Sequence, residues 1–332
     1  MRQNSSSTTQ KNTPVGADLA RARPNACYMA LCCCFLLLAA CSSSPSPSLS
    51  PTVVASAVAT SAPTSTPTPT PGPAPARYTA QTLLQGGYRP DDLAFDTQGR
   101  LLFSDFYNNT ISRLNADGSV TTLLRGINGP EGMVMLQDGT LIVAEQRTNR
   151  ILSFTPGSHT PTLLRQLPGT PSAAHCKDGV DGIAFDPTTD TVIVPDSPNG
   201  NVYRLSLDGK TLTLLASGIV RPVGAYVDAQ GTIYVADECG GAVWTIAPGG
   251  KTARIGGFGM PDDVFLDGHG NLLLIDLQPS IHALIRVNLA TGKRQTLASA
   301  GYIEPQGLLM DAHGNIFVSD DYADKIVEYK PA

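Results

Sequence analysis

Six carboxylates recur in the sequence in a pattern that could hold a metal ion or activate water. Each ends a short apolar segment, 15 residues after the residue that opens its repeat, or 16 residues in the third repeat. The opening residues are Pro90, Pro130, Val180, Pro222, Pro261 and Pro305, and the closing carboxylates are Asp105, Glu145, Asp196, Asp237, Asp276 and Asp320. Carboxylate oxygens bind hard cations and can act as general bases.

A second set of polar side chains follows the opening residues directly. These positions are Asp91, Glu131, Asp181, Val223, Asp262 and Gln306. Four acids facing one channel would repel one another without a cation or ordered water. The closing carboxylates have a simpler interpretation, because a carboxylate present in every repeat is typical of a residue that accepts hydrogen bonds from loop N–H groups. We favour this structural role for all of them except Asp196, for which position alone does not decide.

The elements that must position these residues are β-hairpins. The stretch from Arg89 to Asp105, RPDDLAFDTQGRLLFSD, reads as two short apolar strands around an Asp/Gly turn. Two further strand-like segments follow in most copies, so each unit of about 40–45 residues predicts four strands, which is the signature of a propeller. The sequence therefore predicts an all-β, six-bladed β-propeller over residues 78–332.

The sixth copy ends after its third strand. Residues 78–84 (YTAQTLL) match the fourth strands of the other units and precede the first copy, so we expect them to complete blade six and close the ring. In a propeller, the first strand of each blade lines the central channel and the second strand returns to the same face. Both sets of polar residues are therefore predicted to converge at one mouth of the channel.

The repeat resembles the NHL-type propellers and, more closely, the regucalcin, gluconolactonase and luciferin-regenerating enzyme family. The resemblance is carried by PDDLAF, PEGMVM, VDGIAF and PDS in the first three repeats. It implies a calcium ion held at the channel mouth by Asp91, Glu131, Asp181 and Asp196, with Asp196 also acting as the base for lactone hydrolysis. Of these four, only Asp196 has the residue type that the family uses.

Two histidines and two cysteines lie in loops that should reach the mouth. His175, in the insertion before blade three, and His282, after Asp276, could serve as a general base or metal ligand, or could have neither role. We expect Cys176 in the same insertion and Cys239 on blade four to form a disulfide, with free thiols or a metal-binding pair as the alternatives.

The N-terminal residues predict export. Residues 1–40 end in the apolar run YMALCCCFLLLAA, which is too short to cross a bilayer stably. Leu38-Ala39-Ala40-Cys41 resembles the lipobox of bacterial lipoproteins, which implies a lipid on Cys41 and a protein anchored outside the cytoplasmic membrane or in the cell envelope. A plain signal peptide and an uncleaved anchor are the alternatives. Residues 41–77 then form a Pro/Ser/Thr-rich linker that is predicted to be disordered.

Charge narrows the choice of partners. Loss of residues 1–41 would remove four basic residues and one acid from totals of 23 and 28, leaving 19 against 27 and a net charge of −8. This balance disfavours nucleic acid and anionic lipid headgroups. We expect a monomer whose partner is a small-molecule substrate or a surface ligand. Our first hypothesis is a calcium-dependent hydrolase of a lactone or small ester, and the second is a non-catalytic propeller that binds a protein, peptide or sugar.

Overall fold

We describe residues 73–332 of the chain in a computed structural model. The predicted signal segment 1–40, Cys41 and most of the predicted linker lie outside the described residues. Within the described range the chain is all-β apart from two short 3₁₀ helices, η1 (Gln146–Thr148) and η2 (Ser197–Asn199). None of the described helices has the length and apolar character needed to span a bilayer.

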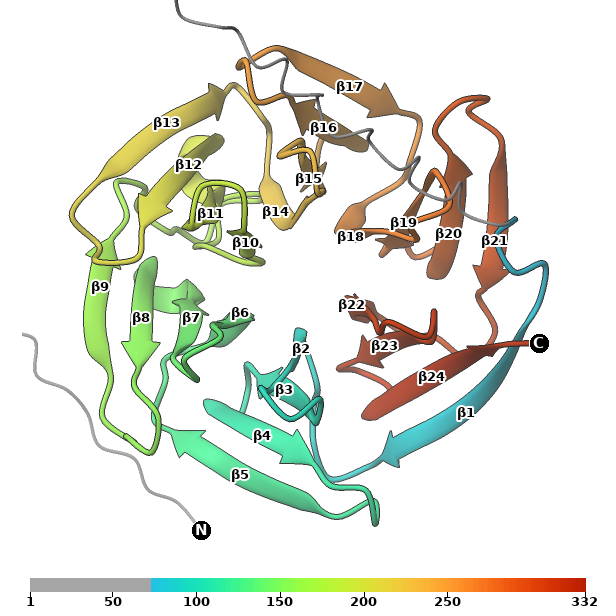
Figure 1. The fold of residues 1–332 in the computed structure, drawn as a ribbon, viewed down its shortest axis with the longest axis horizontal. Coiled ribbons are helices and arrows are strands. Elements are labelled where there is room, and N and C mark those ends of the chain that lie inside the picture. The colour runs from blue at the N-terminus through green and yellow to red at the C-terminus, as the bar shows by residue number, and fades with distance from the viewer. Residues whose placement is uncertain (1–72) are drawn as a thin grey trace, which may run out of the picture. The chain divides into compact units, whose positions relative to one another are not determined.

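Six four-stranded antiparallel sheets surround a central channel, which confirms the predicted six-bladed propeller (Figure 1). Blades one and two contain β2 (Leu93–Phe95), β3 (Leu101–Asp105), β4 (Thr110–Leu114), β5 (Val120–Arg125), β6 (Pro130–Met135), β7 (Leu141–Glu145), β8 (Arg150–Phe154) and β9 (Thr162–Gln166). Blades three and four contain β10 (Ala184–Asp186), β11 (Thr191–Asp196), β12 (Asn201–Ser206), β13 (Leu212–Ser217), β14 (Pro222–Val227), β15 (Ile233–Asp237), β16 (Ala242–Ile246) and β17 (Thr252–Gly256). Blades five and six contain β18 (Pro261–Leu266), β19 (Asn271–Asp276), β20 (Ala283–Asn288), β21 (Arg294–Ala298), β22 (Pro305–Met310), β23 (Ile316–Asp320), β24 (Lys325–Pro331) and β1 (Tyr78–Gln85).

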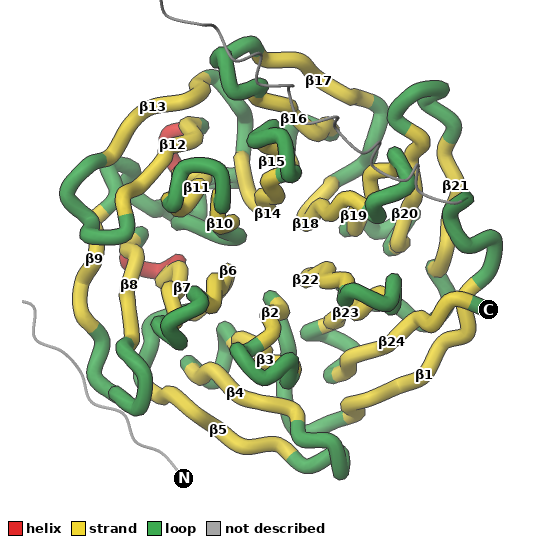
Figure 2. The backbone as a smooth tube through the Cα atoms, in the orientation of Figure 1, coloured by secondary structure: helices red, strands yellow, loops and turns green. Residues whose placement is uncertain are grey.

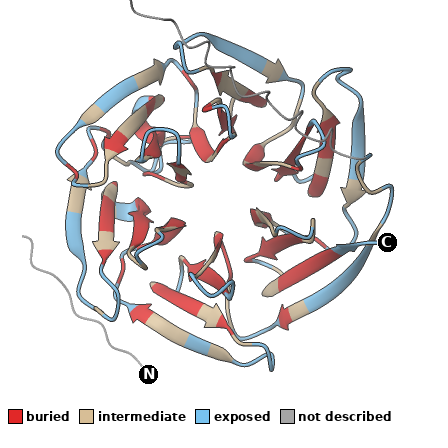
Figure 3. Ribbon diagram, in the orientation of Figure 1, coloured by how far each residue is buried: buried red, intermediate tan, exposed pale blue. Residues whose placement is uncertain are grey.

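The N-terminal strand closes the ring as predicted. β1 pairs antiparallel with β24 from Tyr78 opposite Pro331 to Gln85 opposite Lys325. In Figures 1 and 2 the first strand of each blade lies nearest the channel and the fourth lies at the periphery. Burial decreases in the same order: the inner strands are largely buried, and the outer strands are partly exposed (Figure 3).

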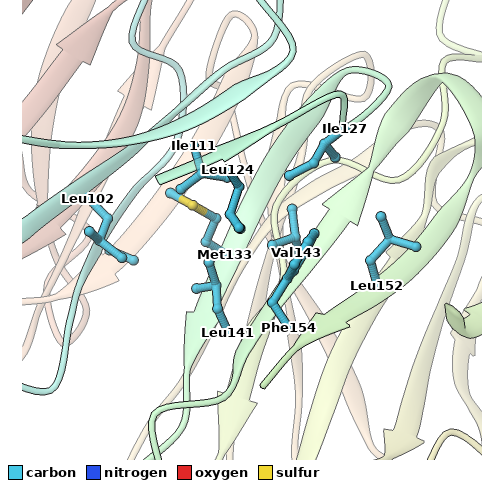
Figure 4. Close-up of a cluster of buried hydrophobic side chains, with 10 residues drawn as sticks. Leu102, Ile111, Leu124, Ile127, Met133, Leu141, Val143, Leu152 and Phe154 are labelled. Carbon is cyan, nitrogen blue, oxygen red and sulfur yellow. The ribbon is translucent and has the colours of Figure 1, made fainter. Parts of the chain in front are cut away.

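The core is divided among the blade interfaces. Six clusters of buried hydrophobic side chains occur, one between each pair of neighbouring blades. The alternation of β7 shows why: Leu141 and Val143 pack toward blade one (Figure 4), whereas Ile142 and Ala144 pack toward blade three. Each blade therefore packs against its two neighbours through the two faces of its sheet.

Blade three departs from the predicted repeat. Its first strand begins at Ala184 rather than near Val180, where the sequence placed the opening of the hairpin. The preceding backbone bonds to blade two instead of to its own second strand, because the N–H of Val180 donates to Asn149 Oδ1 at 2.7 Å and the carbonyl of Asp181 accepts from Gly132 at 3.2 Å. The side chain of Asp181 thereby keeps its place at the channel.

Glycines let the first strands approach one another around the channel. A Cβ atom added at any of four equivalent positions would meet backbone of the next blade at 2.5–2.7 Å; these positions are Gly132, Gly182, Gly224 and Gly307. The other two blades carry aspartates there instead. Asp92 Oδ2 accepts from Met133 N at 2.9 Å, and Asp263 Oδ2 accepts from Leu308 N at 2.8 Å, so these carboxyl groups link each blade to the next.

This packing predicts a specific sensitivity. In Gly182→Ala the new methyl group would lie 2.7 Å from the Gly224 Cα atom, so we expect the free energy of unfolding to fall by about 1–3 kcal/mol through overpacking. The matched control is Gly249→Ala, where nothing lies within 4 Å of the added atom. Urea denaturation measures both variants, and equal stability of the two would contradict this account of the channel.

Candidate functional site

One mouth of the channel forms a hollow of about 280 Å³ with strongly polar walls, which we call the acidic hollow. Eight of its lining residues are acids: Asp91, Glu131, Asp178, Asp181, Glu238, Asp262, Glu304 and Asp321. The only lysine or arginine in the lining is Arg221. Gln146, Gln306, Phe106, Tyr107 and Tyr322 contribute the polar and aromatic remainder together with Leu277.

The opposite end of the channel is different in character. The residues that line a second hollow of about 280 Å³ are mainly apolar, such as Phe95, Phe185 and Phe265, and also include Asp92 and Asp263. Burial raises the pKa of Asp92 to about 7. The two ends of one channel therefore offer contrasting surfaces, and polar chemistry is concentrated at the acidic hollow.

The first-strand positions supply one part of the acidic hollow. Asp91, Glu131, Asp181, Asp262 and Gln306 all line it, from five different blades. Val223 is the exception and is fully buried. Three of the four ligands expected from the family resemblance, Asp91, Glu131 and Asp181, therefore lie around one hollow.

The closing carboxylates face the loops instead. Each accepts a hydrogen bond from a backbone N–H of the loop that enters its own blade: Asp105 from Arg89 (3.1 Å), Glu145 from Asn128 (2.9 Å), Asp196 from Gly169 (2.9 Å), Asp237 from Arg221 (3.0 Å), Asp276 from Met260 (2.9 Å) and Asp320 from Ile303 (2.8 Å). This arrangement matches the structural alternative for the repeated carboxylate, since burying loop N–H groups requires acceptors.

Asp196 does not line the acidic hollow and is not brought together with the other expected ligands. It is fully buried, and its Oδ1 accepts from Asn149 Nδ2 at 2.8 Å. Its Oδ2 accepts from Gly169 N at 2.9 Å and from Asn199 Nδ2 at 3.1 Å. Burial raises the pKa of Asp196, and these three donors oppose the shift. Its contacts are those of a loop anchor like its five counterparts.

Asp91 and Glu131 form a buried carboxyl pair. Their side chains hydrogen bond to each other, so a proton is shared between the two carboxyl groups. Burial raises the pKa of Asp91 well above its ordinary value, and burial together with the Asp91 charge does the same for Glu131. The pair therefore holds a proton in a position where a cation could replace it.

Asp181 has a cationic neighbour. Arg221 Nη2 lies 3.2 Å from Asp181 Oδ2 and 3.5 Å from Asp178 Oδ2, and its Nη1 pairs with Glu238. Gln146 Nε2 also donates to Asp181 at 3.3 Å. Burial raises the pKa of Asp181, and the Arg221 charge opposes this shift. Arg221 thus partly offsets the negative charge on the side of the hollow formed by blades three and four.

Asp321 occupies the opposite side. It is 2% exposed, and its Oδ1 atom has no hydrogen-bond partner among the described residues. Its Oδ2 atom lies 3.6 Å from Arg89 Nη2. Burial, followed by the charge of Glu304, raises the pKa of Asp321 to about 7, while Arg89 opposes the shift.

Sequence reasoning missed Asp321, Glu238 and Arg221. Asp321 and Glu238 each follow a closing carboxylate directly, as do Phe106, Gln146 and Leu277, which also line the hollow. Because neighbouring side chains along a strand point in opposite directions, a residue next to a loop anchor faces the channel. That alternation was the available signal. Arg221 directly precedes the opening residue of its repeat, as Arg89 does in the first repeat, and this shared position was the signal available for it.

A disulfide fixes the rim near Arg221. Cys176 and Cys239 are bonded, with 6.2 Å between their Cα atoms, and thus join the insertion before blade three to blade four. Cys176 lies two residues before Asp178, and Cys239 follows Glu238. The bond therefore restrains the two segments whose carboxylates pair with Arg221.

The two predicted rim histidines lie outside the hollow lining. A ring nitrogen of His175 lies within 4.8 Å of both disulfide sulfurs, and this is the only set of three or more His, Cys, Asp or Glu ligand atoms so close together in residues 73–332. Burial, followed by the Asp320 charge, raises the pKa of Glu304, and the nearby His282 opposes this shift. The carboxylates of the hollow are therefore spread around it rather than gathered into a cage.

Comparison with known proteins identifies the fold. No family model and no curated protein matches the sequence. A gluconolactonase from Xanthomonas campestris is 17% identical, with a TM-score of 0.63 over 78% of this chain and 91% of that chain. A catalytically inactive virginiamycin B lyase from Staphylococcus aureus, solved with quinupristin, is 14% identical, with a TM-score of 0.59 over 76% and 99%.

A third similar structure has a binding function. A nidogen/laminin complex matches with 19% identity and a TM-score of 0.59, over 69% of this chain and 88% of that chain. At these identities the similarity shows the propeller fold alone, and one fold serves hydrolysis, lyase chemistry and protein binding. The function of this chain has to be argued from its own site.

The raised pKa values predict how stability depends on pH. Asp321 titrates at about 7 in the folded protein against an ordinary 3.8, so the folded state binds the proton more tightly. Its contribution to stability is present at low pH and is lost as pH rises through about 7. We expect the melting temperature to fall between about pH 4 and pH 7, and Asp321→Asn to reduce that fall. Identical pH profiles for the two proteins would contradict this assignment.

Proposed function

We propose that the acidic hollow is the active site of a calcium-dependent hydrolase that acts on a lactone or small ester. The observation that carries the proposal is the buried Asp91–Glu131 carboxyl pair, in the same hollow as Asp321 with its unpartnered Oδ1 atom. The pair is suited to holding a cation, and Asp321 is suited to accepting a proton from water. Both lie in a hollow large enough for a small substrate.

The donor chemistry of the hollow fits calcium, which takes about six to eight oxygen ligands at about 2.3–2.6 Å. Asp91 and Glu131 would hold the ion in place of their shared proton. Asp181 is engaged by Arg221 and Gln146, so it would support the site from outside the ion's ligands. Because no three carboxylates are gathered within 4.8 Å in the described chain, water or substrate oxygens would complete the shell.

Bound calcium supplies a Lewis acid for the substrate carbonyl. Asp321 would then act as the general base, because a carboxylate that titrates at about 7 is well matched to neutral solution. It takes one proton from water, the water oxygen bonds to the carbonyl carbon, and the ester C–O bond breaks. The alkoxide leaving group takes up a proton, giving a carboxylic acid and an alcohol, which remain joined when the substrate is a lactone.

Export and lipid attachment at Cys41 form part of the proposal. The apolar run that ends at Cys41 supports a lipoprotein signal, and the Cys176–Cys239 disulfide suits an oxidising compartment. A hydrolase held at the cell envelope would meet its substrates outside the cytoplasm.

A second candidate function is ligand binding without catalysis. Five of the seven large hydrophobic side chains exposed on the described chain lie in loops at the mouth face: Tyr107, Val220, Ile281, Ile303 and Tyr322. Exposed apolar groups gathered on one face favour a protein, peptide or sugar partner. The two functions differ in their dependence on Asp321, because only hydrolysis requires its proton transfer.

Calcium binding predicts a stability change. At about 100 times its dissociation constant, calcium should raise the melting temperature by about 5–10 °C, and a chelator should reverse the rise. Asp91→Asn should abolish the shift. The matched control is Asp138→Asn, which removes the same charge from an exposed residue in a strand-connecting turn and should retain it. A calcium shift that persists in Asp91→Asn would remove the Asp91–Glu131 pair as the ion site.

Hydrolysis of a lactone and ester panel distinguishes the two candidate bases. We expect Asp321→Asn to lower kcat by about 10²–10⁴-fold with little change in KM, as for loss of a general base. The rate of the unmodified protein should rise with pH through about 7. Asp196→Asn should lower stability and leave that pH profile in place. If Asp196→Asn abolished the pH dependence and Asp321→Asn did not, the base would be Asp196.

A further inference from the structure

We propose that the side of the acidic hollow formed by Glu304, Tyr107 and Tyr322 binds a positively charged amine on the substrate. This inference rests on the proposed hydrolase site and names the substrate class: an ester or lactone that carries a protonated or quaternary amine next to an apolar body. It is carried by the distribution of charge, by the aromatic rim and by the unpartnered oxygen of Asp321.

The charge of the hollow is unevenly compensated. On the side of blades three and four, Arg221 pairs with Asp178, Asp181 and Glu238. Asp91, Glu131, Asp262, Glu304 and Asp321 lie on the remaining blades, and no lysine or arginine lines the hollow there. Arg89 lies 3.6 Å from Asp321 and partly offsets the charge there. A calcium ion on the Asp91–Glu131 pair together with this one arginine would still leave an excess of carboxyl groups on blades five and six. A cationic ligand would supply the missing charge.

Asp321 shows independently that the hollow is built to receive a polar group. Its side chain is only 2% exposed, and its Oδ1 atom makes no hydrogen bond in the described chain, although the Gln306 side chain is close enough to lower the pKa of Asp321. Leaving a buried carboxylate oxygen unpaired is costly, so a ligand or water normally satisfies it. Glu304 is close enough to raise the pKa of Asp321 through its charge, which places both carboxyl groups at the same end of the hollow.

Two tyrosines make an aromatic rim over this end. Tyr107 and Tyr322 hydrogen bond through their hydroxyl groups at 3.1 Å, and their rings meet edge to face with centroids 6.2 Å apart. The Arg89 guanidinium lies 3.5 Å from the Tyr107 centroid and 4.3 Å from the Tyr322 centroid. The rings nevertheless remain 41% and 51% exposed.

Arg89 therefore holds the two tyrosines in place, and both side chains remain accessible to a ligand. Arg89 is itself held by a hydrogen bond to the Asp321 carbonyl oxygen at 3.1 Å. Tyrosine faces attract cations and also pack against apolar groups, while Glu304 provides the formal negative charge. Glu304 is half-buried, and its backbone N–H donates to Asp320 at 3.1 Å, so the closing carboxylate of blade six positions it.

The experiment uses two esters that differ only in charge. Butyrylcholine and 3,3-dimethylbutyl butyrate have the same shape, with a quaternary nitrogen in one and a carbon in the other. We expect kcat/KM for the choline ester to be about tenfold or more above that for its neutral partner, because a cation over an aromatic ring next to a carboxylate is stabilised. Measurements are made at one ionic strength, since salt screens the effect.

Substitutions at the proposed subsite test whether it is the source of the preference for the charged ester. Glu304→Gln and Tyr322→Leu should each lower the ratio of the two kcat/KM values, whereas the control Asp138→Asn should keep it. A merely structural defect would lower both rates together and leave the ratio unchanged. Equal kcat/KM values for the two esters in the unmodified protein, or a ratio unaffected by both variants, would overturn the inference while leaving the hydrolase proposal intact.

Choline binding separates failure of the inference from failure of the proposed function. Titration calorimetry of the unmodified protein with choline alone requires no catalysis. Binding that weakens in Glu304→Gln, with neither ester hydrolysed, would support the cation subsite and count against the hydrolase. Absence of choline binding together with absence of charge preference would overturn the subsite.

Discussion

The first strands of the six blades approach so closely around the channel that four of them meet the next blade at a glycine. A Cβ atom at Gly182 would stand 2.7 Å from Gly224, and comparable contacts occur at the other three positions. In five of the six blades the residue before this glycine or aspartate lines the mouth of the channel, and Val223 is the exception. Asp91, Glu131 and Asp262 are forced together in this way, although they belong to different blades. The acidic hollow is a consequence of backbone packing.

That concentration of acid has an energetic cost, which the rest of the mouth partly offsets. Burial raises the pKa values of Asp91, Glu131 and Asp262 well above their ordinary values, so these groups resist ionisation. Arg221 offsets part of the negative charge on one side of the hollow. The Cys176–Cys239 disulfide restrains the segments whose carboxylates surround Arg221. On the other side Arg89 pairs with Asp321 and offsets only part of the negative charge. Functional sites commonly retain such unfavourable arrangements because a ligand relieves them.

The repeat made the fold and part of the site predictable. Periodic hairpins were enough to place Asp91, Glu131 and Asp181 at one mouth, because strand order in a propeller follows from the repeat itself. Asp321 was missed because its neighbour Asp320 belongs to the set of closing carboxylates, which was easier to recognise in the sequence. That set proved to accept hydrogen bonds from loop N–H groups. The ion pairs of Arg221 with Asp178 and Asp181 and the start of β10 depend on contacts between blades, such as Val180 with Asn149, which no local pattern encodes.

The pairing of β1 with β24 has a consequence for biosynthesis. β1 is the first strand of the propeller to be made, and its only strand partner is formed from the last residues of the chain. During synthesis β1 and the unfinished ring therefore present open sheet edges, which are prone to pairing with other chains. Contacts so distant in sequence also slow folding. This favours a route in which closure of the ring waits until β24 has been made.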